Sequence, residues 1–132
     1  MDRLFLDANV LFSMAYGSKA LSILEDKARQ GRFKIIASAY VVEEASRNLS
    51  RLDHLSRLKE LLADLTIVPE ADPGMPCPVN LPAKDVPVLM AAIQSRATHL
   101  ITGDLSHFGQ YRGKNIAGVL ICTPRDYVVA DT

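Results

Sequence analysis

The sequence has no excess of charge of either sign, because 15 lysines and arginines balance 15 aspartates and glutamates. Overall basicity therefore does not attract this chain to nucleic acid, and any attraction to phosphate must come from a local basic patch or a bound cation. Cysteine is also scarce. Cys77 and Cys122 lack the CxxC spacing, and no histidine stands at zinc-finger spacing, so zinc binding by this pair is not expected. Two isolated cysteines fit a reducing cytoplasm better than secretion.

Long apolar runs are missing as well. No run approaches the ~20 residues that a membrane-spanning helix needs, and the opening residues MDRLFLD do not resemble a signal peptide, so we expect no membrane association. The 132 residues, of which 48% are hydrophobic, fit a single domain over 1–132 with its own core. Neither a GxSxG motif nor a Cys–His arrangement is present, so no side-chain nucleophile is evident.

Short β-rich segments alternate with amphipathic segments along the chain. This alternation predicts a three-layer α/β/α fold with a mostly parallel, five-stranded sheet. Strands are expected at 3–6, 33–37, 66–70, 99–102 and 116–122, helices at 10–17, 18–31, 39–52, 54–65, 85–97 and 124–131, and a polar loop at 103–115.

Proline is concentrated in one place, since six of the seven prolines fall within 69–87. Proline removes a backbone donor and fixes φ, so most of this segment is expected to be a loop near the rim of the sheet. Pro87 is compatible with a helix that begins at Asp85, because proline is well accepted in a first helical turn.

Four carboxylates stand where apolar segments begin or end: Asp7, Glu44, Asp85 and Asp104. In parallel α/β sheets, functional sites collect beyond the carboxyl ends of the strands, where the strand order reverses. If the first and fourth strands are neighbours, Asp7 and Asp104 face each other there, and helices bring the other two acids to the same rim. Like charges ~5 Å apart at an effective dielectric of ~20 repel by about 3 kcal/mol. We therefore expect a divalent cation among them.

Each carboxylate also has an ordinary structural explanation. Asp7 can cap a helix, Asp104 fits a turn, and the helix dipole favours Asp85 in a first turn. Glu44 has the strongest alternative, a solvated ion pair with an arginine such as Arg47 on its own helix. One metal site nevertheless explains all four residues more economically than four separate roles.

Nearby polar residues are candidates for supporting roles. Thr102 is predicted to bond a site aspartate through its hydroxyl, and Asn9 either orients Asp7 or caps the helix. His107 lies in the following loop and could reach substrate, although a loop histidine more often has no such role. The basic residues near the predicted rim are candidates for holding phosphate: Lys84, Arg47, Arg112 and Lys114.

The motifs, taken in order, resemble those of the PIN domain, the compact α/β fold of metal-dependent ribonucleases that includes the toxins of many prokaryotic toxin–antitoxin pairs. The resemblance covers essentially the whole chain. Its four motifs are FLDANVLFS with Asp7 and Asn9, SAYVVEEASRNL with Glu44, KDVPVLMAAI with Asp85, and LITGDLSHF with Thr102 and Asp104. In the second motif the trailing ExxRxL pattern favours Glu44, with Glu43 as the alternative.

The resemblance implies hydrolysis of phosphodiester bonds in single-stranded RNA, leaving a 5′-phosphate. The ligands of one or two Mg²⁺ or Mn²⁺ ions would be Asp7, Glu44, Asp85 and Asp104. It also implies a protein antitoxin and a homodimer as candidate partners; the leucine-rich 55–65 segment could serve the dimer or the chain's own core. Some family members carry an additional acid where this chain has Ser106, so a second metal is expected to bind more loosely, or only with substrate.

Two other functions stay open. The segment DANVLF resembles the opening motif of haloacid-dehalogenase-like phosphatases, but Asn9 replaces their second aspartate. The other alternative is a PIN-like module that binds RNA or protein with little catalysis, which fits the zero net charge and Ser106. The residues alone indicate only metal-assisted chemistry on an anionic substrate.

Overall fold

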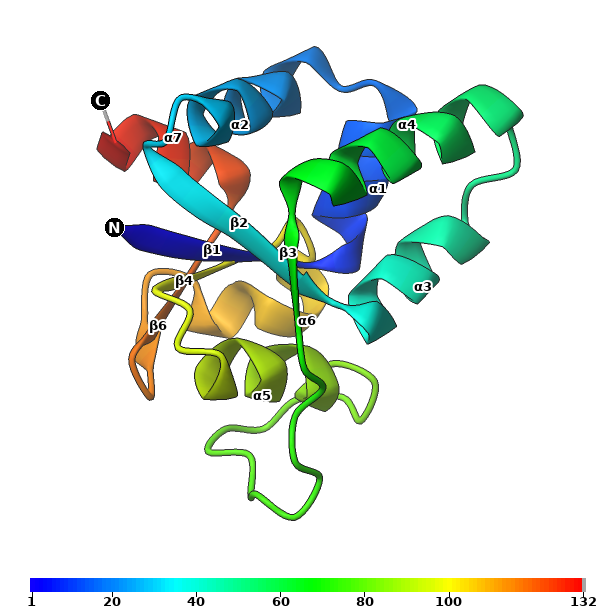
Figure 1. Cartoon of the computed structure of the whole chain (residues 1–132). Coiled ribbons are helices and arrows are strands. Elements are labelled where there is room, and N and C mark those ends of the chain that lie inside the picture. Colours follow the sequence, from blue (N-terminus) through cyan, green and yellow to red (C-terminus); the bar gives the residue numbers. More distant parts are fainter. Residues whose placement is uncertain (132) are drawn as a thin grey trace.

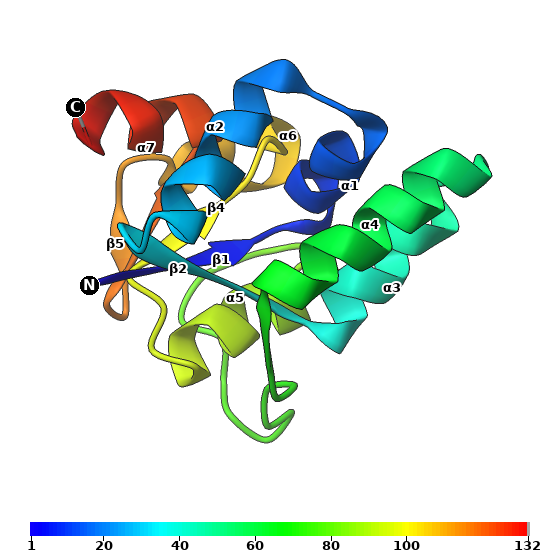
Figure 2. The same ribbon diagram turned by 45° about the horizontal axis from the view of Figure 1, so that its top comes forward.

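The computed structural model describes residues 1–131 as a six-stranded sheet between two helical layers (Figures 1 and 2). The strands are β1 (Asp2–Leu6), β2 (Phe33–Ser38), β3 (Thr66–Val68), β4 (His99–Ile101), β5 (Asn115–Ile116) and β6 (Val119–Cys122). The α-helices are α1 (Ala8–Tyr16), α2 (Lys19–Arg29), α3 (Ala39–Arg47), α4 (Leu52–Asp64), α5 (Val86–Gln94), α6 (Leu105–Phe108) and α7 (Pro124–Asp131). Figure 1 shows α2, α4 and α7 over one face and α5 under the other.

The strand order is β3-β2-β1-β4-β6-β5, with β1 parallel to both β2 and β4. Phe5 is paired with Ile36 on one side and with Leu100 on the other. The chain thus leaves β1 in one direction for β2 and later returns to its other side for β4, which makes this the point where strand order reverses. The α/β class, the mostly parallel sheet and the adjacency of the first and fourth strands are confirmed.

The expected number of five strands was one too low, because 116–122 is not a single strand. Ala117 and Gly118 have φ angles of 51° and 95°, so the chain turns back between them. Such positive angles at both central positions are typical of a two-residue hairpin turn. Asn115–Ile116 consequently forms β5, which pairs antiparallel with β6.

One helix prediction and one loop prediction also need correction. The helix expected over 39–52 ends at Arg47, and the next begins at Leu52, so 48–51 is a connection. Leu49 remains buried in this connection, whereas Leu52, expected in the apolar stripe, is 82% exposed. The loop expected at 103–115 contains α6 and a 3-10 turn, Gly109–Tyr111.

The core lies on both faces of the central strand. Leu4, Phe5 and Leu6 are all fully buried, because helices cover the two faces of the sheet. On α4, Leu58 and Leu61 are buried, so the leucine-rich 55–65 segment packs mainly into the chain's own core. No helix within 1–131 is both long and apolar enough to cross a membrane.

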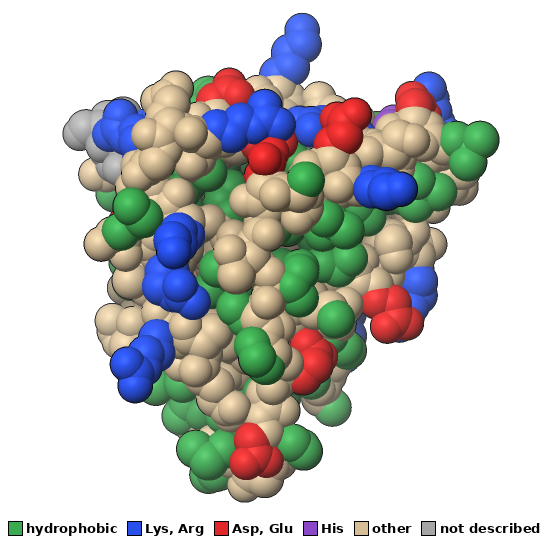
Figure 3. All heavy atoms as spheres, viewed as in Figure 1, with side chains coloured by type: hydrophobic (Ala, Val, Ile, Leu, Met, Phe, Trp, Pro, Cys, Tyr) green, Lys and Arg blue, Asp and Glu red, His purple; other side chains and the backbone are tan. Residues whose placement is uncertain are grey.

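The proline-rich segment between β3 and α5 contains neither helix nor strand, as predicted. It is held to the domain by two tyrosines. The hydroxyl of Tyr40 donates to the Lys84 carbonyl at 2.8 Å, and that of Tyr111 donates to the Asn80 carbonyl at 2.7 Å. In Figure 3 the two signs of charge are mixed over the visible face, and hydrophobic side chains are prominent at its lower tip, where Figure 1 places this loop. Pro87 lies in the first turn of α5, as expected.

Candidate metal centre

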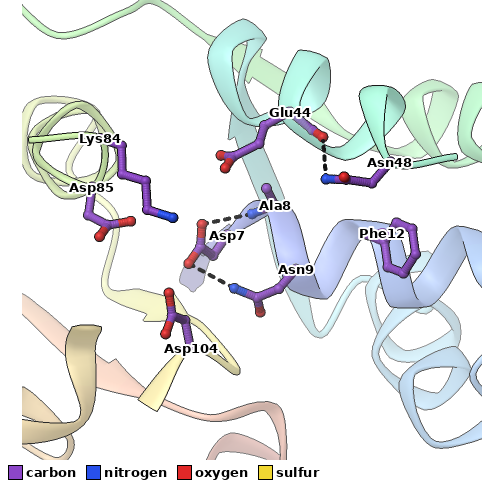
Figure 4. A pocket seen from close by; sticks show the side chains of 9 residues that line it. All are labelled: Asp7, Ala8, Asn9, Phe12, Glu44, Asn48, Lys84, Asp85 and Asp104. Carbon is purple, nitrogen blue, oxygen red and sulfur yellow. Dashed lines mark hydrogen bonds between the residues drawn. The ribbon is translucent and has the colours of Figure 1, made fainter. Parts of the chain in front are cut away.

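A cavity of about 450 Å³ opens where β1 and β4 end, and the four predicted carboxylates line it together. Asp7 follows β1 and caps α1, Asp104 follows β4 and caps α6, and Asp85 precedes α5. Glu44 reaches the cavity from the middle of α3. Figure 4 shows the four side chains pointing into the same space from four different helices or helix starts. Residues up to 97 positions apart in sequence therefore meet at the rim that the topology predicts.

Asp7 is the most firmly held of the four. Its Oδ1 accepts the Ala8 amide at 2.8 Å, and its Oδ2 accepts the Asn9 side-chain amide at 3.0 Å and the Thr102 hydroxyl at 2.8 Å. Burial raises the pKa of this carboxyl; the hydrogen bonds from Thr102 and Ala8 partly oppose that rise, and the nearby charges of Asp85 and Glu44 add to it. A buried carboxylate beside other carboxylates is stabilised in its charged form when a cation binds next to it.

Asn9 and Thr102 connect the ends of β1 and β4. The Asn9 side-chain oxygen accepts the Gly103 amide at 2.7 Å, and the Thr102 hydroxyl oxygen accepts the Asp104 amide at 3.0 Å. A Cβ atom at position 103 would lie only 3.1 Å from that Asn9 oxygen, which explains why glycine fits there. Asn9 thus orients Asp7 rather than capping a helix, and Thr102 makes the bond to a site aspartate that was predicted.

Glu43 and Glu44 differ clearly in their surroundings. Glu43 is exposed and pairs with Arg47 through one contact of 2.8 Å on the surface of α3. Glu44 lines the cavity, and Figure 4 shows its carboxylate directed toward the other acids. The ion pair with Arg47 that offered an ordinary explanation for Glu44 therefore belongs to its neighbour.

The side chain of His107 lies between Asp85 and Asp104, although the sequence analysis predicts no specific role for it. The ring nitrogen Nδ1 of His107 lies 2.8 Å from Oδ2 of Asp85 and 2.8 Å from Oδ2 of Asp104. Burial raises the pKa of Asp85, and the His107 charge opposes that rise. For Asp104 burial alone would raise the pKa, but the Ser106 hydroxyl and the His107 amide outweigh it and the pKa falls. The sequence signal that could have pointed to His107 is its position three residues after Asp104, the residue that caps α6.

Of the basic residues considered from the sequence, Lys84 lines the cavity. Figure 4 shows its ammonium group extending between Asp85 and Asp7. Arg112 pairs with Asp126 at 2.8 Å, away from the carboxylates, and the Arg47 guanidinium is paired as described above. Lys84 thus brings a positive charge to the place where the four acids converge.

The residues present fit a divalent cation. Carboxylate oxygens are the donors that Mg²⁺ and Mn²⁺ prefer. Asp85 Oδ2 is buried, and apart from its ion pair with His107 it has no hydrogen-bond partner among the described residues, although a buried carboxylate oxygen can accept more than one. A cation in the cavity would complete its coordination.

The acid-lined cavity lies beyond the strand ends at the reversal point of a parallel sheet, which is where open α/β domains bind their ligands. The model of the PIN domain matches residues 3–106, and the chain belongs to the PIN domain family. No curated protein sequence matches it. A chain in the crystal structure of VapBC2 from Rickettsia felis, bound to a DNA fragment from their promoter, superposes with a TM-score of 0.65. The match covers 92% of this chain and 98% of that chain at 17% identity, so it shows a shared fold.

Proposed function

We propose that this protein is a metal-dependent endoribonuclease that hydrolyses phosphodiester bonds of single-stranded RNA, with Asp7, Glu44, Asp85 and Asp104 as ligands of Mg²⁺ or Mn²⁺. The observation that carries the proposal is the convergence of all four carboxylates on one cavity. A bound divalent ion supplies Lewis-acid activation of the phosphate and of a water molecule. This explains why the site needs no serine or cysteine nucleophile.

The chain's own residues would prepare the site for this chemistry. Asp7 keeps one orientation because three donors fix its two oxygens. Lys84 places an ammonium group at the cavity, where it can hold a phosphate oxygen as a point charge. Such fixed groups lower the cost of organising the site when the substrate binds.

An aromatic row beside the acids supports a single-stranded substrate. Phe12 lines the acid cavity and also a second cavity of about 370 Å³ that Tyr16 lines. The ring centroids of Phe12 and Tyr16 are 5.6 Å apart, and those of Tyr16 and His54 are 4.4 Å apart. Tyr16 is 61% exposed, so its ring is accessible for stacking. Unpaired bases stack on such side chains, whereas paired bases in a duplex cannot.

The likeness to a chain of VapBC2 supports a role in a toxin–antitoxin pair with a protein antitoxin as partner. The free cysteines Cys77 and Cys122 fit the cytoplasm as the place of action. A neighbouring gene that encodes a small DNA-binding protein would support this part of the proposal. Co-expression of the two proteins, followed by purification through a tag on one of them, tests whether they associate. Separate elution would contradict the pairing without affecting the nuclease proposal.

The nuclease proposal is tested with labelled single-stranded RNA in the presence of Mn²⁺, of EDTA, and of the Asp104→Asn variant. We expect cleavage with Mn²⁺ and a loss of at least about a hundredfold in the other two cases, because both remove cation binding. Cleavage that persists in EDTA and in the variant would refute the assignment. Turnover of a generic phosphomonoester would instead indicate a phosphatase, and RNA binding without cleavage would indicate the binding module.

A further inference from the structure

We propose that His107 supplies a nitrogen ligand to the cation through Nδ1, together with Asp85 and Asp104, and that this ligand favours Mn²⁺ over Mg²⁺. The inference rests on the proposed metal site and extends it by one residue. It assigns a role to a side chain that neither the four-acid motif nor the position of Ser106 accounts for.

The first argument is the spacing of the three donor atoms. Nδ1 of His107 lies 2.8 Å from an oxygen of each aspartate, and all three atoms lie within 4.8 Å of one another. Adjacent ligands of an octahedral ion with bonds of about 2.1 Å are separated by about 3 Å, and opposite ligands by about 4.2 Å. The two separations from Nδ1 to an aspartate oxygen are therefore close to the one expected for adjacent ligands of a single small cation.

The second argument is the burial of two of the donor atoms. Apart from the ion-pair contacts of Nδ1 with the two aspartates, Asp85 Oδ2 and His107 Nδ1 are buried without a hydrogen-bond partner among the described residues. A bound cation would be a shared partner for both atoms. Asp85 is 7% exposed, so water does not readily replace the missing partner.

The third argument is the use of the two Asp104 oxygens. Oδ1 accepts the Ser106 hydroxyl at 2.7 Å and the His107 amide at 3.2 Å. These bonds orient the carboxylate so that Oδ2 faces the His107 ring. Ser106 thus orients Asp104 instead of being a ligand itself, and the imidazole of the next residue, His107, is the additional donor beside Asp104.

The choice of metal follows from ligand chemistry. Mg²⁺ takes oxygen ligands and keeps several waters, whereas first-row transition ions accept imidazole nitrogen readily. The ratio of Mn²⁺ affinity to Mg²⁺ affinity should therefore be higher for a site with one nitrogen and several carboxylate oxygens than for a site with oxygen ligands alone.

The test is electron spin-echo spectroscopy of the full chain loaded with one equivalent of Mn²⁺. Samples with ¹⁵N at histidine alone are compared with unlabelled samples. If a histidine nitrogen is coupled to the Mn²⁺ electron spin, the ¹⁴N modulation of the echo is replaced by that of ¹⁵N in the labelled sample. The chain has three histidines, which gives matched controls. We expect histidine coupling in the native chain, in His54→Gln and in His99→Gln, and its loss in His107→Gln. The ratio of Mn²⁺ to Mg²⁺ affinity, from calorimetric titration, should fall about tenfold in His107→Gln alone.

The outcomes separate this inference from the proposed function. Bound Mn²⁺ without histidine coupling in the native chain would overturn the inference and leave the four-carboxylate site standing. Coupling that survives in His107→Gln, or that disappears in either control, would overturn it as well. If the native chain binds no Mn²⁺, or if Asp7→Asn binds it equally, the proposed metal site itself fails. The native-chain spectrum decides the matter even if His107→Gln does not fold.

Discussion

The hydroxyl of Thr102 donates a 2.8 Å hydrogen bond to Oδ2 of Asp7, across the two strand ends between which the sheet reverses its order. The bond joins residues 95 positions apart in sequence and involves two groups that are almost completely buried. Because the same hydroxyl also accepts the Asp104 amide, one threonine positions two of the four carboxylates.

Thr102→Val should therefore affect both stability and the metal. We expect the free energy of unfolding to fall by about 1 kcal/mol, because a buried carboxylate loses a donor. Mn²⁺ affinity should fall about tenfold, as for other residues that orient ligands. The matched control is Thr98→Val, since Thr98 accepts the Arg3 amide at 2.9 Å at the opposite end of β4. Thr98→Val should lose stability but keep its Mn²⁺ affinity; equal loss of affinity would argue against a specific role for Thr102.

Metal-free stability should depend on pH in a characteristic direction. The pKa values of Asp7 and Asp85 are raised, first by burial, so the folded state binds protons more tightly than the unfolded state. Their contribution to stability is present below the ordinary value of 3.8 and is lost as pH rises through the raised values. Urea unfolding in EDTA should show this loss above about pH 4.

Asp85→Asn should reduce that pH dependence and stabilise the metal-free protein at pH 7 by roughly 1 kcal/mol, because it removes a charge whose burial outweighs the attraction of His107 and Lys84. Asp26→Asn, at an exposed position of α2, is the control and should change little. When Mn²⁺ is present, the native chain should be more stable than Asp85→Asn, because its Tm should rise by more. Identical gains would mean that the ion binds elsewhere.

The adjacent glutamates of α3 provide a matched pair for catalysis. Glu44→Gln should lower kcat/KM for RNA by at least about tenfold, because a ligand of the cation loses its charge. Glu43→Gln should leave kcat/KM within about twofold, since its carboxylate is exposed and pairs with Arg47. Measured initial rates at several Mn²⁺ concentrations compare the two; an equal effect of both variants would contradict the assignment.

Tyr16→Ala should weaken the binding of single-stranded RNA without changing the chemical step. A stacked base contributes roughly 1–3 kcal/mol, so KM should rise about fivefold or more while kcat stays nearly constant. Tyr16→Phe keeps an aromatic face and should behave like the native chain. A rise in KM with both variants would indicate that the hydroxyl, and not stacking, matters.

The convergence of the four carboxylates on one cavity could be predicted from the sequence because its signals are local. Asp7 and Asp104 follow apolar strand segments, and the adjacency of those strands places them at one rim. His107 escaped prediction because its role depends on the approach of Asp85 from a distant helix. The break after Arg47 escaped prediction because the leucine spacing continues through it to Leu52. The turn at Ala117 escaped because the apolar run continues on both sides of Gly118, its only turn signal.

The short outer strands of the sheet have a consequence for assembly. β3 has three residues and leads into the proline-rich loop, while β5 has two residues and ends in the hairpin turn. Neither border offers a neighbouring polypeptide a row of free amides and carbonyls long enough to extend the sheet. Any complex formed by this protein is therefore expected to use helical surfaces, and the chain is protected from the strand-by-strand stacking that leads to fibrils.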